Sequence, residues 1–252
     1  VHIADAGVDA IRKGFTRYTA VEGIPDLKDA IIAKFRRDNG IEYTRPQILV
    51  STGAKQTIYN LFMAVIDPGD EVIIPAPYWV SYPDIALLAE GTPITPYARP
   101  DQGYKITPAQ LEAAISPKTR LFMLNSPSNP TGAAYTSAEL HALGAVLRRH
   151  PDVLIATDDM YEHIFWAKEP FCSFLTACPD LYDRTVTING VSKSYAMTGW
   201  RIGYCGGPVE IVTAMSTIQS QCTSNPVSIS QKAAAAALNG DQACVAEMNK
   251  HF

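Results

Sequence analysis

The order of apolar and polar segments along the chain constrains the fold more than any other feature. Short strand-like runs such as 48–50, 71–74 and 121–124 alternate with helical patterns, for example 55–66 and 137–149. Strands separated by helices need crossover connections, which give a mostly parallel sheet covered by helices on both faces. We therefore predict an α/β protein, a three-layer sandwich around a mostly parallel central sheet.

Further segments continue this alternation. We expect strands at 93–97, 153–156, 185–188 and 202–205, and helices at 82–89 and 107–115. Thr107 followed by Pro108 is a typical helix start, because the hydroxyl caps the first turn and proline suits its first position. In such sheets ligands bind beyond the carboxyl ends of the strands. The residues that follow each strand are therefore the candidates for a functional site.

Composition excludes several classes of protein. The 252 residues carry 21 Lys and Arg against 25 Asp and Glu, a formal net charge of -4. This balance gives no basic surface for nucleic acid, and no apolar run approaches the roughly 20 residues that span a bilayer. Five cysteines without a CxxC pair argue against a disulfide framework and against a zinc site. We expect a cytoplasmic protein that binds no nucleic acid, membrane or metal.

Small residues follow the strand at 48–50 and open the next helix. This segment contains Gly53, Ala54 and Lys55. Free N–H groups and the helix dipole make such a turn a good phosphate site. The segment lacks both the Walker spacing and the dinucleotide-binding glycine pattern, so on its own it is better explained as a tight strand-to-helix connection.

Polar residues follow three other strands. Asn129 lies in a loop whose two X-Pro bonds each suit a cis bond, although its residues are also common in ordinary turns. Asp158 is placed to pair with a buried cationic nitrogen, and equally to cap a following helix. Lys193 could act as an amine nucleophile and Arg201 could bind a phosphate. A surface lysine and a structural arginine are the ordinary alternatives.

Together these positions supply a phosphate site, an amide, a carboxylate, a phenol at Tyr161, an amine and a guanidinium. Pyridoxal 5'-phosphate requires this set of groups. Its aldehyde needs a lysine, its ring nitrogen an acid, its phenolate oxygen hydrogen-bond donors, and its phosphate N–H groups and a cation. We therefore expect this cofactor.

The chain resembles the fold-type I pyridoxal-phosphate enzymes of the aspartate aminotransferase superfamily, and among them the bacterial aspartate aminotransferase subgroup. The resemblance runs from about Tyr18 to near the end of the chain. Three motifs carry it, namely Asn129-Pro130-Thr131-Gly132, Asp158-x-x-Tyr161 and the segment 190–203. The third motif has small residues before Lys193 and a Gly-x-Arg pattern that ends at Arg201. The last segment matches the whole Schiff-base lysine pattern of the superfamily.

The resemblance implies a role for each residue around the cofactor ring. Lys193 would be the Schiff-base lysine, which also moves the substrate proton. Asp158 would keep the ring nitrogen protonated, and Tyr161 and Asn129 would donate hydrogen bonds to the phenolate oxygen. Trp79 would stack on the ring, where without the resemblance it would be a core aromatic residue. Trp79 and Asn129 are also the expected substrate-binding residues.

The resemblance also implies how the phosphate is held and that the protein forms a homodimer. Gly53, Ala54, Lys55 and Arg201 would bind the phosphate, mainly through backbone N–H groups at the first three. Tyr18 would reach the phosphate of the neighbouring subunit.

Chains of the superfamily usually run longer than this one. We expect residues 1–17 to be an N-terminal helical remnant and 18–252 to be the cofactor-binding large domain of a fold-type I enzyme. The N-terminal arm and the smaller C-terminal domain are expected to lie outside this sequence. The arginine for the substrate α-carboxylate can be assigned to no residue here.

The expected reaction is transamination between an amino acid, aspartate first, and a 2-oxo acid such as 2-oxoglutarate. Two other activities use the same lysine chemistry, namely an aromatic aminotransferase and a C–S β-lyase. A non-catalytic domain that senses pyridoxal phosphate is a further alternative.

Overall fold

The computed structural model describes residues 1–167 and 169–251, which divide into two compact units. Unit 1 contains residues 1–60 and the chain from 188 onward, and unit 2 contains residues 61–187. Helix α3 (Ala54–Val65) and strand β6 (Thr185–Gly190) both run through the boundary in sequence.

The described residues form seven strands of one mixed, mostly parallel sheet. They are β1 (Ile48–Ser51), β2 (Glu71–Ile73), β3 (Thr92–Ile94), β4 (Thr119–Asn125), β5 (Leu154–Asp158), β6 and β7 (Gly203–Gly206), hydrogen-bonded in the order β1-β7-β6-β5-β4-β2-β3. In unit 2, β3, β2, β4 and β5 run parallel, and in unit 1 β1 and β7 pair antiparallel. The predicted α/β class with a mostly parallel sheet is confirmed.

Among the helices of the described residues, α5 (Pro108–Ala114) and α6 (Ser137–Leu147) begin at threonine caps. Besides these two and α3, the helices are α1 (His2–Arg12), α2 (Pro25–Lys34), α4 (Ser81–Leu88), α7 (Phe174–Ala177), α8 (Val209–Cys222), α9 (Ser228–Asn239) and α10 (Ala243–Asn249). Thr107 caps α5 by accepting a hydrogen bond from the Gln110 N–H at 3.2 Å, with Pro108 first in the helix, as predicted. Thr136 caps α6 in the same way.

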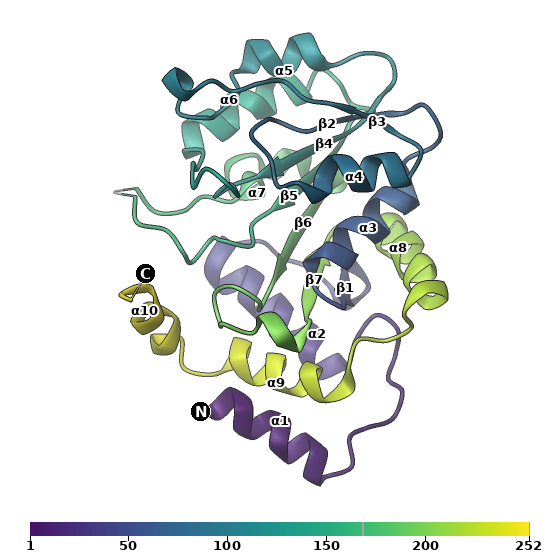
Figure 1. The fold of residues 1–252 in the computed structure, drawn as a ribbon, viewed down its shortest axis with the longest axis vertical. Coiled ribbons are helices and arrows are strands. Elements are labelled where there is room, and N and C mark those ends of the chain that lie inside the picture. Colours follow the sequence, from purple (N-terminus) through teal and green to yellow (C-terminus); the bar gives the residue numbers. More distant parts are fainter. Residues whose placement is uncertain (168, 252) are drawn as a thin grey trace. The chain divides into compact units, whose positions relative to one another are not determined.

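In unit 2 the apolar side chains of the strands pack against three helices. Phe122, Leu124 and Ile155 are buried with Leu111 of α5 and Leu143 of α6, and α7 contributes Phe174 to the same core. Figure 1 shows α5 and α6 together on one side of these strands and α4 on the other. The parallel register pairs Asn125 with Asp158, so the carboxyl ends of β4 and β5 lie level with each other.

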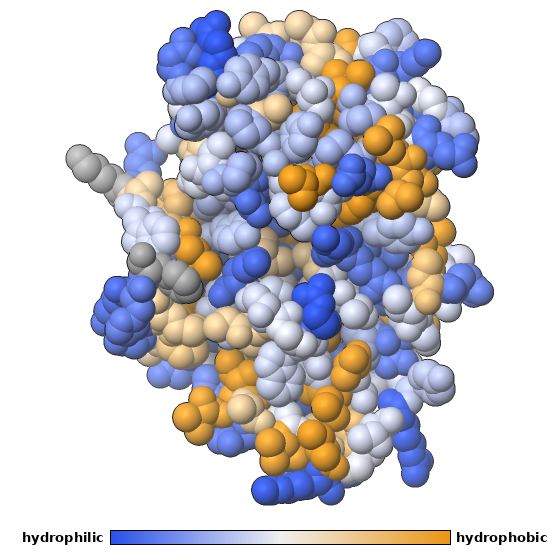
Figure 2. All heavy atoms as spheres, viewed as in Figure 1, coloured by the Kyte–Doolittle hydropathy of each residue, from blue (hydrophilic) through white to orange (hydrophobic). Residues whose placement is uncertain are grey.

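In unit 1 small residues allow close packing of helices. Helix α9 packs against α1 and α2, and half of its buried residues are alanines. Gly7 of α1 leaves room for the Trp200 ring, because a methyl group added at Gly7 would come within 2.8 Å of that ring. Helix α1 lies within the segment 1–17, where we expected a helical remnant. Figure 2 shows hydrophobic surface over α1, where Val8 and Ile11 are 43% and 54% exposed.

Two differences from the expected elements have local causes. Strand β3 ends at Ile94, short of the expected end at residue 97, because Pro96 has no N–H to continue the ladder. Helix α2 is absent from the expected elements, because its buried side chains include Lys28 and Lys34 and its buried face therefore does not stand out in the sequence as an apolar stripe. None of the helices formed by the described residues is long and apolar enough to cross a membrane.

Candidate functional site

Unit 1 contains a cradle for an anion between the start of α3 and Arg201. Gly53 has φ +86°, and a methyl group there would collide with the Arg201 guanidinium. Ala54 begins α3, and Gly203 of β7 lies so close that a side chain on it would strike the Ala54 nitrogen. The first N–H groups of a helix have no partner within it and carry the positive end of its dipole. The turn therefore presents N–H groups and a guanidinium at one place.

Arg201 is held in this position by its own backbone. Its φ of +57° is unusual for a residue with a side chain, and its Nη1 donates a hydrogen bond to the Thr198 carbonyl oxygen at 3.0 Å. The side chain stays largely exposed. Lys55, the next residue of the predicted phosphate site, is also exposed, in the first turn of α3.

Lys193 lies in the turn that follows β6, and its side chain is half-buried. The turn is fixed by a hydrogen bond from the Ala196 N–H to the Lys193 carbonyl oxygen at 3.1 Å. The neighbouring Ser194 Oγ is buried and has no hydrogen-bond partner within the part of the chain that the structure describes. A buried hydroxyl without a partner is costly, so it favours a site that a polar group completes.

Tyr18, the remaining predicted site residue of unit 1, follows α1 in a segment without regular structure. Its side chain is 90% exposed, which leaves the phenol open to contact with another molecule.

Unit 2 holds a buried carboxylate at the carboxyl end of β5. Asp158 is only 6% exposed, and its Oδ2 accepts a hydrogen bond from the Tyr82 hydroxyl at 2.7 Å. Its Oδ1 accepts from the Met160 N–H at 3.2 Å. No α-helix starts directly after Asp158, because residues 160–163 form turns, so the alternative role as a helix cap does not apply.

Trp79 joins this cluster through Tyr82. The two rings pack edge to face, with centroids 5.4 Å apart and planes at 84°. Tyr82 is 2% exposed, whereas Trp79 is half-buried. Burial first, and then the negative charge of Asp158, raise the pKa of Tyr82 well above its ordinary value. The hydroxyl therefore keeps its proton and is the donor to Asp158.

Asn125 connects the Asn129 loop to the same strand end. Its Nδ2 donates to the Asp158 carbonyl oxygen at 2.9 Å, and its Oδ1 accepts from the Asn129 N–H at 2.8 Å. Both X-Pro bonds of the loop, before Pro127 and before Pro130, are cis. The Asn129 backbone is thus tied to the end of β4, which lies level with the end of β5.

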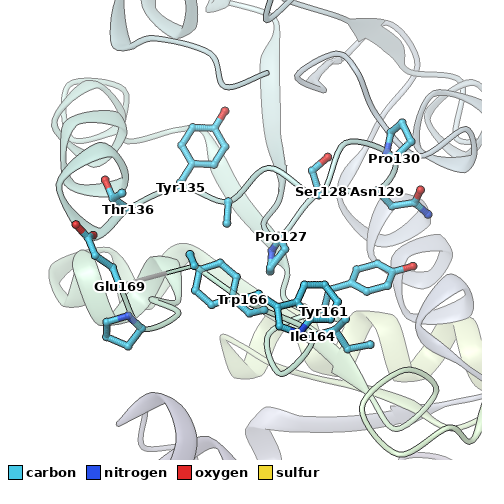
Figure 3. A pocket seen from close by; sticks show the side chains of 15 residues that line it. Pro127, Ser128, Asn129, Pro130, Tyr135, Thr136, Tyr161, Ile164, Trp166 and Glu169 are labelled. Atoms are coloured by element: carbon cyan, nitrogen blue, oxygen red, sulfur yellow. The ribbon is translucent and has the colours of Figure 1, made fainter. Parts of the chain in front are cut away.

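The loop that follows β4 and the segment that follows β5 form the walls of a groove of about 660 Å³ in unit 2. Figure 3 shows Asn129 on one wall and Tyr161 and Trp166 on the other. Tyr161 is half-buried, and Trp166 is 64% exposed. Two of the predicted site residues, Asn129 and Tyr161, therefore line the same groove.

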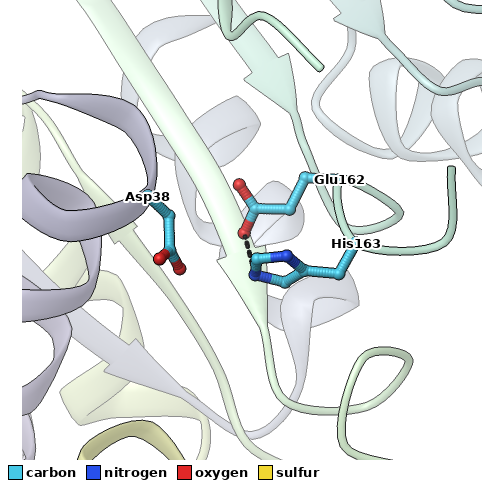
Figure 4. A group of neighbouring side chains, drawn as sticks. All are labelled: Asp38, Glu162 and His163. Atoms are coloured by element: carbon cyan, nitrogen blue, oxygen red, sulfur yellow. Dashed lines mark ion pairs between the residues drawn. The ribbon is translucent and has the colours of Figure 1, made fainter. Parts of the chain in front are cut away.

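Further carboxylates after β5 hold the chain in place. Asp159 accepts a hydrogen bond from Ser173 Oγ at 2.7 Å, and both residues are buried. Glu162 and His163 form an ion pair, with Oε1 and Nε2 3.5 Å apart (Figure 4). The Ser173 hydrogen bond ties the segment that carries Tyr161 to the start of α7.

Comparison with known proteins shows which family has this arrangement. Residues 2–252 match the family described as aminotransferase class I and II. The chain belongs to this family. It is 63% identical over its whole length to an aspartate/prephenate aminotransferase of Nitrosomonas europaea, and 59% identical to that of Cereibacter sphaeroides. It covers 64% and 63% of those two proteins, so it spans somewhat less than two thirds of their length.

Solved structures of the aminotransferase family share the fold. The aspartate aminotransferase of Rhizobium meliloti is similar with a TM-score of 0.98 and 52% identity, over 100% of this chain and 63% of that one. The aspartate aminotransferase of Thermus thermophilus with maleate is similar with a TM-score of 0.93 and 40% identity. This similarity covers 99% of this chain and 64% of that one. The resemblance to aspartate aminotransferases is therefore confirmed.

Each unit contains residues that fit a part of pyridoxal 5'-phosphate. The Gly53 turn leaves a space beside Arg201 that a side chain would fill, the Ser194 hydroxyl lacks a partner among the described residues, and Asp158 offers a buried carboxylate. Unit 1 brings together Gly53, Ala54 and Arg201, and unit 2 connects Asp158 to Trp79 and Asn129. These connections run through Tyr82 and Asn125, to which sequence reasoning gave no role. The spacing Trp79-x-x-Tyr82, one helical turn, was the available signal for Tyr82.

Proposed function

We propose that the chain is the cofactor-binding part of a pyridoxal-phosphate-dependent aminotransferase, and that aspartate and a 2-oxo acid are its substrates. Membership of the aminotransferase family supports the reaction class. Relatives at 53–63% identity are named aspartate or aspartate/prephenate aminotransferase, which supports the substrate class. The fit of the site residues supports the cofactor.

The single observation that carries the proposal is the buried Asp158 carboxylate. A carboxylate with so little exposure needs partners that compensate its lost hydration. Tyr82 and the Met160 N–H supply two hydrogen bonds. A carboxylate accepts hydrogen bonds on both of its oxygens, which suits a protonated ring nitrogen, and its negative charge would hold the proton there.

The other residues bind and orient the cofactor. When bound, pyridoxal 5'-phosphate supplies a reactive aldehyde and a ring that withdraws electrons from the substrate. Gly53, Ala54 and Lys55 would bind the phosphate through backbone N–H groups, and Arg201 would add its guanidinium. Trp79 would cover the face of the ring, and Asn129 and Tyr161 would donate hydrogen bonds to its phenolate oxygen.

Lys193 would bind the cofactor aldehyde and later move a proton at the substrate α-carbon. Its half-buried position in a fixed turn suits an amine that must stay near one reaction centre. Trp79 and Asn129 would also contact the substrate. We assign 2-oxoglutarate as the general amino acceptor, and prephenate as a second acceptor because the relatives at 63% and 59% identity carry that name.

We further propose that the protein works as a homodimer in the cytoplasm. The 90% exposure of Tyr18 supports a role at a neighbouring subunit's phosphate. The apolar surface over α1 (Figure 2) suits contact with protein. All five cysteines are free thiols, as is usual in a reducing compartment.

The proposed function is tested with the complete natural protein and pyridoxal 5'-phosphate. We expect a yellow protein whose visible spectrum changes on adding aspartate and recovers with 2-oxoglutarate. Borohydride should fix the cofactor to Lys193, as shown by peptide mapping. Lys193→Ala should abolish turnover, whereas Lys118→Ala, at a turn of unit 2, should not.

Three outcomes would contradict the assignment. Turnover retained by Lys193→Ala would remove the proposed role of that lysine. A yellow protein that ignores amino acids would favour the cofactor-sensing alternative. Release of ammonia and a thiol from cysteine conjugates, with no transamination, would favour the C–S β-lyase.

A further inference from the structure

Tyr82 contacts two groups that the proposed function places against different parts of one cofactor. Its hydroxyl donates to Asp158 Oδ2 at 2.7 Å, and its ring edge packs on Trp79 with centroids 5.4 Å apart. Asp158 would meet the ring nitrogen, and Trp79 would cover the ring face. One side chain therefore joins the two residues that would define where the ring lies.

The position of Tyr82 is itself fixed. Its side chain is 2% exposed on α4, and its backbone N–H donates to the Trp79 carbonyl oxygen at 3.1 Å. A buried tyrosine that keeps its proton can only be satisfied by an acceptor, and Asp158 is that acceptor. Rotation of the Asp158 carboxylate would break this bond and the bond to the Met160 N–H together.

We propose that Tyr82 is a positioning residue, which orients the Asp158 carboxylate toward the ring nitrogen through its hydroxyl and supports the Trp79 ring through its aromatic edge. This inference rests on the proposed function. The two contacts are separable by substitution. Tyr82→Phe removes the hydroxyl and keeps the ring, whereas Tyr82→Leu removes both.

The test measures equilibrium binding by the cofactor-free natural protein, not turnover. Two ligands are compared, pyridoxal 5'-phosphate and its carbocyclic analogue, in which a CH group replaces the ring nitrogen. Only the first can use the Asp158 carboxylate. We expect Tyr82→Phe to weaken binding of pyridoxal 5'-phosphate about 10-fold, as for a lost hydrogen bond to a charged group, and to leave binding of the analogue unchanged. Tyr82→Leu should weaken both ligands.

Tyr43→Phe is the control. Tyr43 is another buried tyrosine, in unit 1, and its ring packs edge to face on Phe35 with centroids 5.1 Å apart. We expect this variant to bind both ligands as the wild type does. Equal losses for the two ligands in Tyr82→Phe would show a general structural role and overturn the inference, as would no loss for either. Failure of the wild type to bind pyridoxal 5'-phosphate would instead overturn the proposed function, and this inference with it.

Discussion

Gly53 and Gly69 have nearly the same backbone conformation, with φ of +86° and +90°, but different surroundings. A side chain at Gly53 would collide with Arg201, whereas nothing lies within 4 Å of the corresponding position at Gly69. Replacement of either glycine by alanine should lower the free energy of unfolding by about 1–2 kcal/mol, because a side chain disfavours the left-handed backbone conformation. Only Gly53→Ala should also displace the guanidinium from the phosphate cradle.

We therefore expect both variants to lower Tm, and only Gly53→Ala to weaken binding of pyridoxal 5'-phosphate, by about 10-fold for one charged hydrogen bond. Thermal unfolding and cofactor titration of the two variants check this. Binding of pyridoxal without its phosphate should change little in Gly53→Ala. An equal loss of cofactor binding in Gly69→Ala would contradict a local role for the cradle.

Asp158→Asn tests the charge of this buried group, because asparagine can still accept the hydrogen bond from Tyr82. We expect the variant to bind the cofactor and to lose at least about 100-fold in the rate of proton transfer, since a neutral amide cannot hold the ring nitrogen protonated. Single-turnover kinetics with aspartate measure this rate. Unchanged kinetics would show that the negative charge plays no part.

Sequence reasoning at the residue scale named the groups to which we assign chemistry and missed groups that contact them. Lys193, Asp158 and Arg201 stand at strand ends within recognisable motifs. Tyr82 and Asn125 act through contacts with residues 76 and 33 positions away, at Asp158. Spacing along one element does not encode such long-range hydrogen bonds.

At the scale of elements, a paired arginine and aspartate join α6 to the 3-10 helix 179–184. Arg148, which caps α6, donates two hydrogen bonds to Asp180, each 2.7 Å long. They lower the pKa of Asp180 from its ordinary value of 3.8 to about 2. A lowered pKa means that the stabilisation is present above pH 3.8 and is lost as pH falls through about 2.

The Asp180 side chain is 52% exposed, so solvent screening limits the stabilisation to about 0.5–1 kcal/mol. We expect Asp180→Asn to be less stable than the wild type by this amount at pH 7, and the difference to shrink as pH falls below about 4. Denaturant unfolding at several pH values measures it. The double variant Asp180→Asn/Arg148→Gln, compared with the two single variants, isolates the interaction free energy of the pair. A stability difference between wild type and Asp180→Asn that does not change with pH would rule out titration of Asp180 as its cause.

Elements were predictable where a single periodicity dominates. The buried strand at 121–124 and the capped helix that begins at Pro108 follow directly from the sequence pattern. Helix α2 escaped prediction because tertiary packing buries Lys28 and Lys34, which hides its apolar face in the sequence. The end of β3 depended on Pro96, whose missing N–H interrupts the ladder before pairing resumes between Ala76 and Tyr97.

At the scale of the whole molecule, the predicted site residues come from segments far apart in sequence. The parallel topology explains why this is possible, since the carboxyl ends of β4 and β5 lie level in unit 2. The parallel direction of these strands could be anticipated from the alternation of strands and helices. The division of the chain into two compact units could not, because α3 and β6 continue through the boundary without any change in composition.

The last prediction concerns the assembly. If Tyr18 of one subunit completes the phosphate site of the other, two inactive variants can restore each other. The Tyr18→Ala homodimer should lose most of its activity when the cofactor is limiting. The Lys193→Ala homodimer should lose most of its activity at any cofactor concentration. In the mixed dimer, the intact Lys193 belongs to the Tyr18→Ala subunit, and its site receives an intact Tyr18 from the other subunit. The second site of the same dimer lacks both groups.

Mixed dimers can be isolated if each variant carries a different affinity tag and the protein is purified on both tags in turn. We expect them to show about half of the wild-type activity per dimer, because one of the two sites is complete and independent sites contribute additively. Mixed dimers of Lys193→Ala with the wild type are the control, and they should also show about half of the wild-type activity per dimer. If Tyr18 acts within its own subunit, no site of the first mixture contains both groups, and activity stays at the level of the impaired homodimers. That result would exclude a shared site, and a purified protein that is monomeric with full activity would exclude it as well.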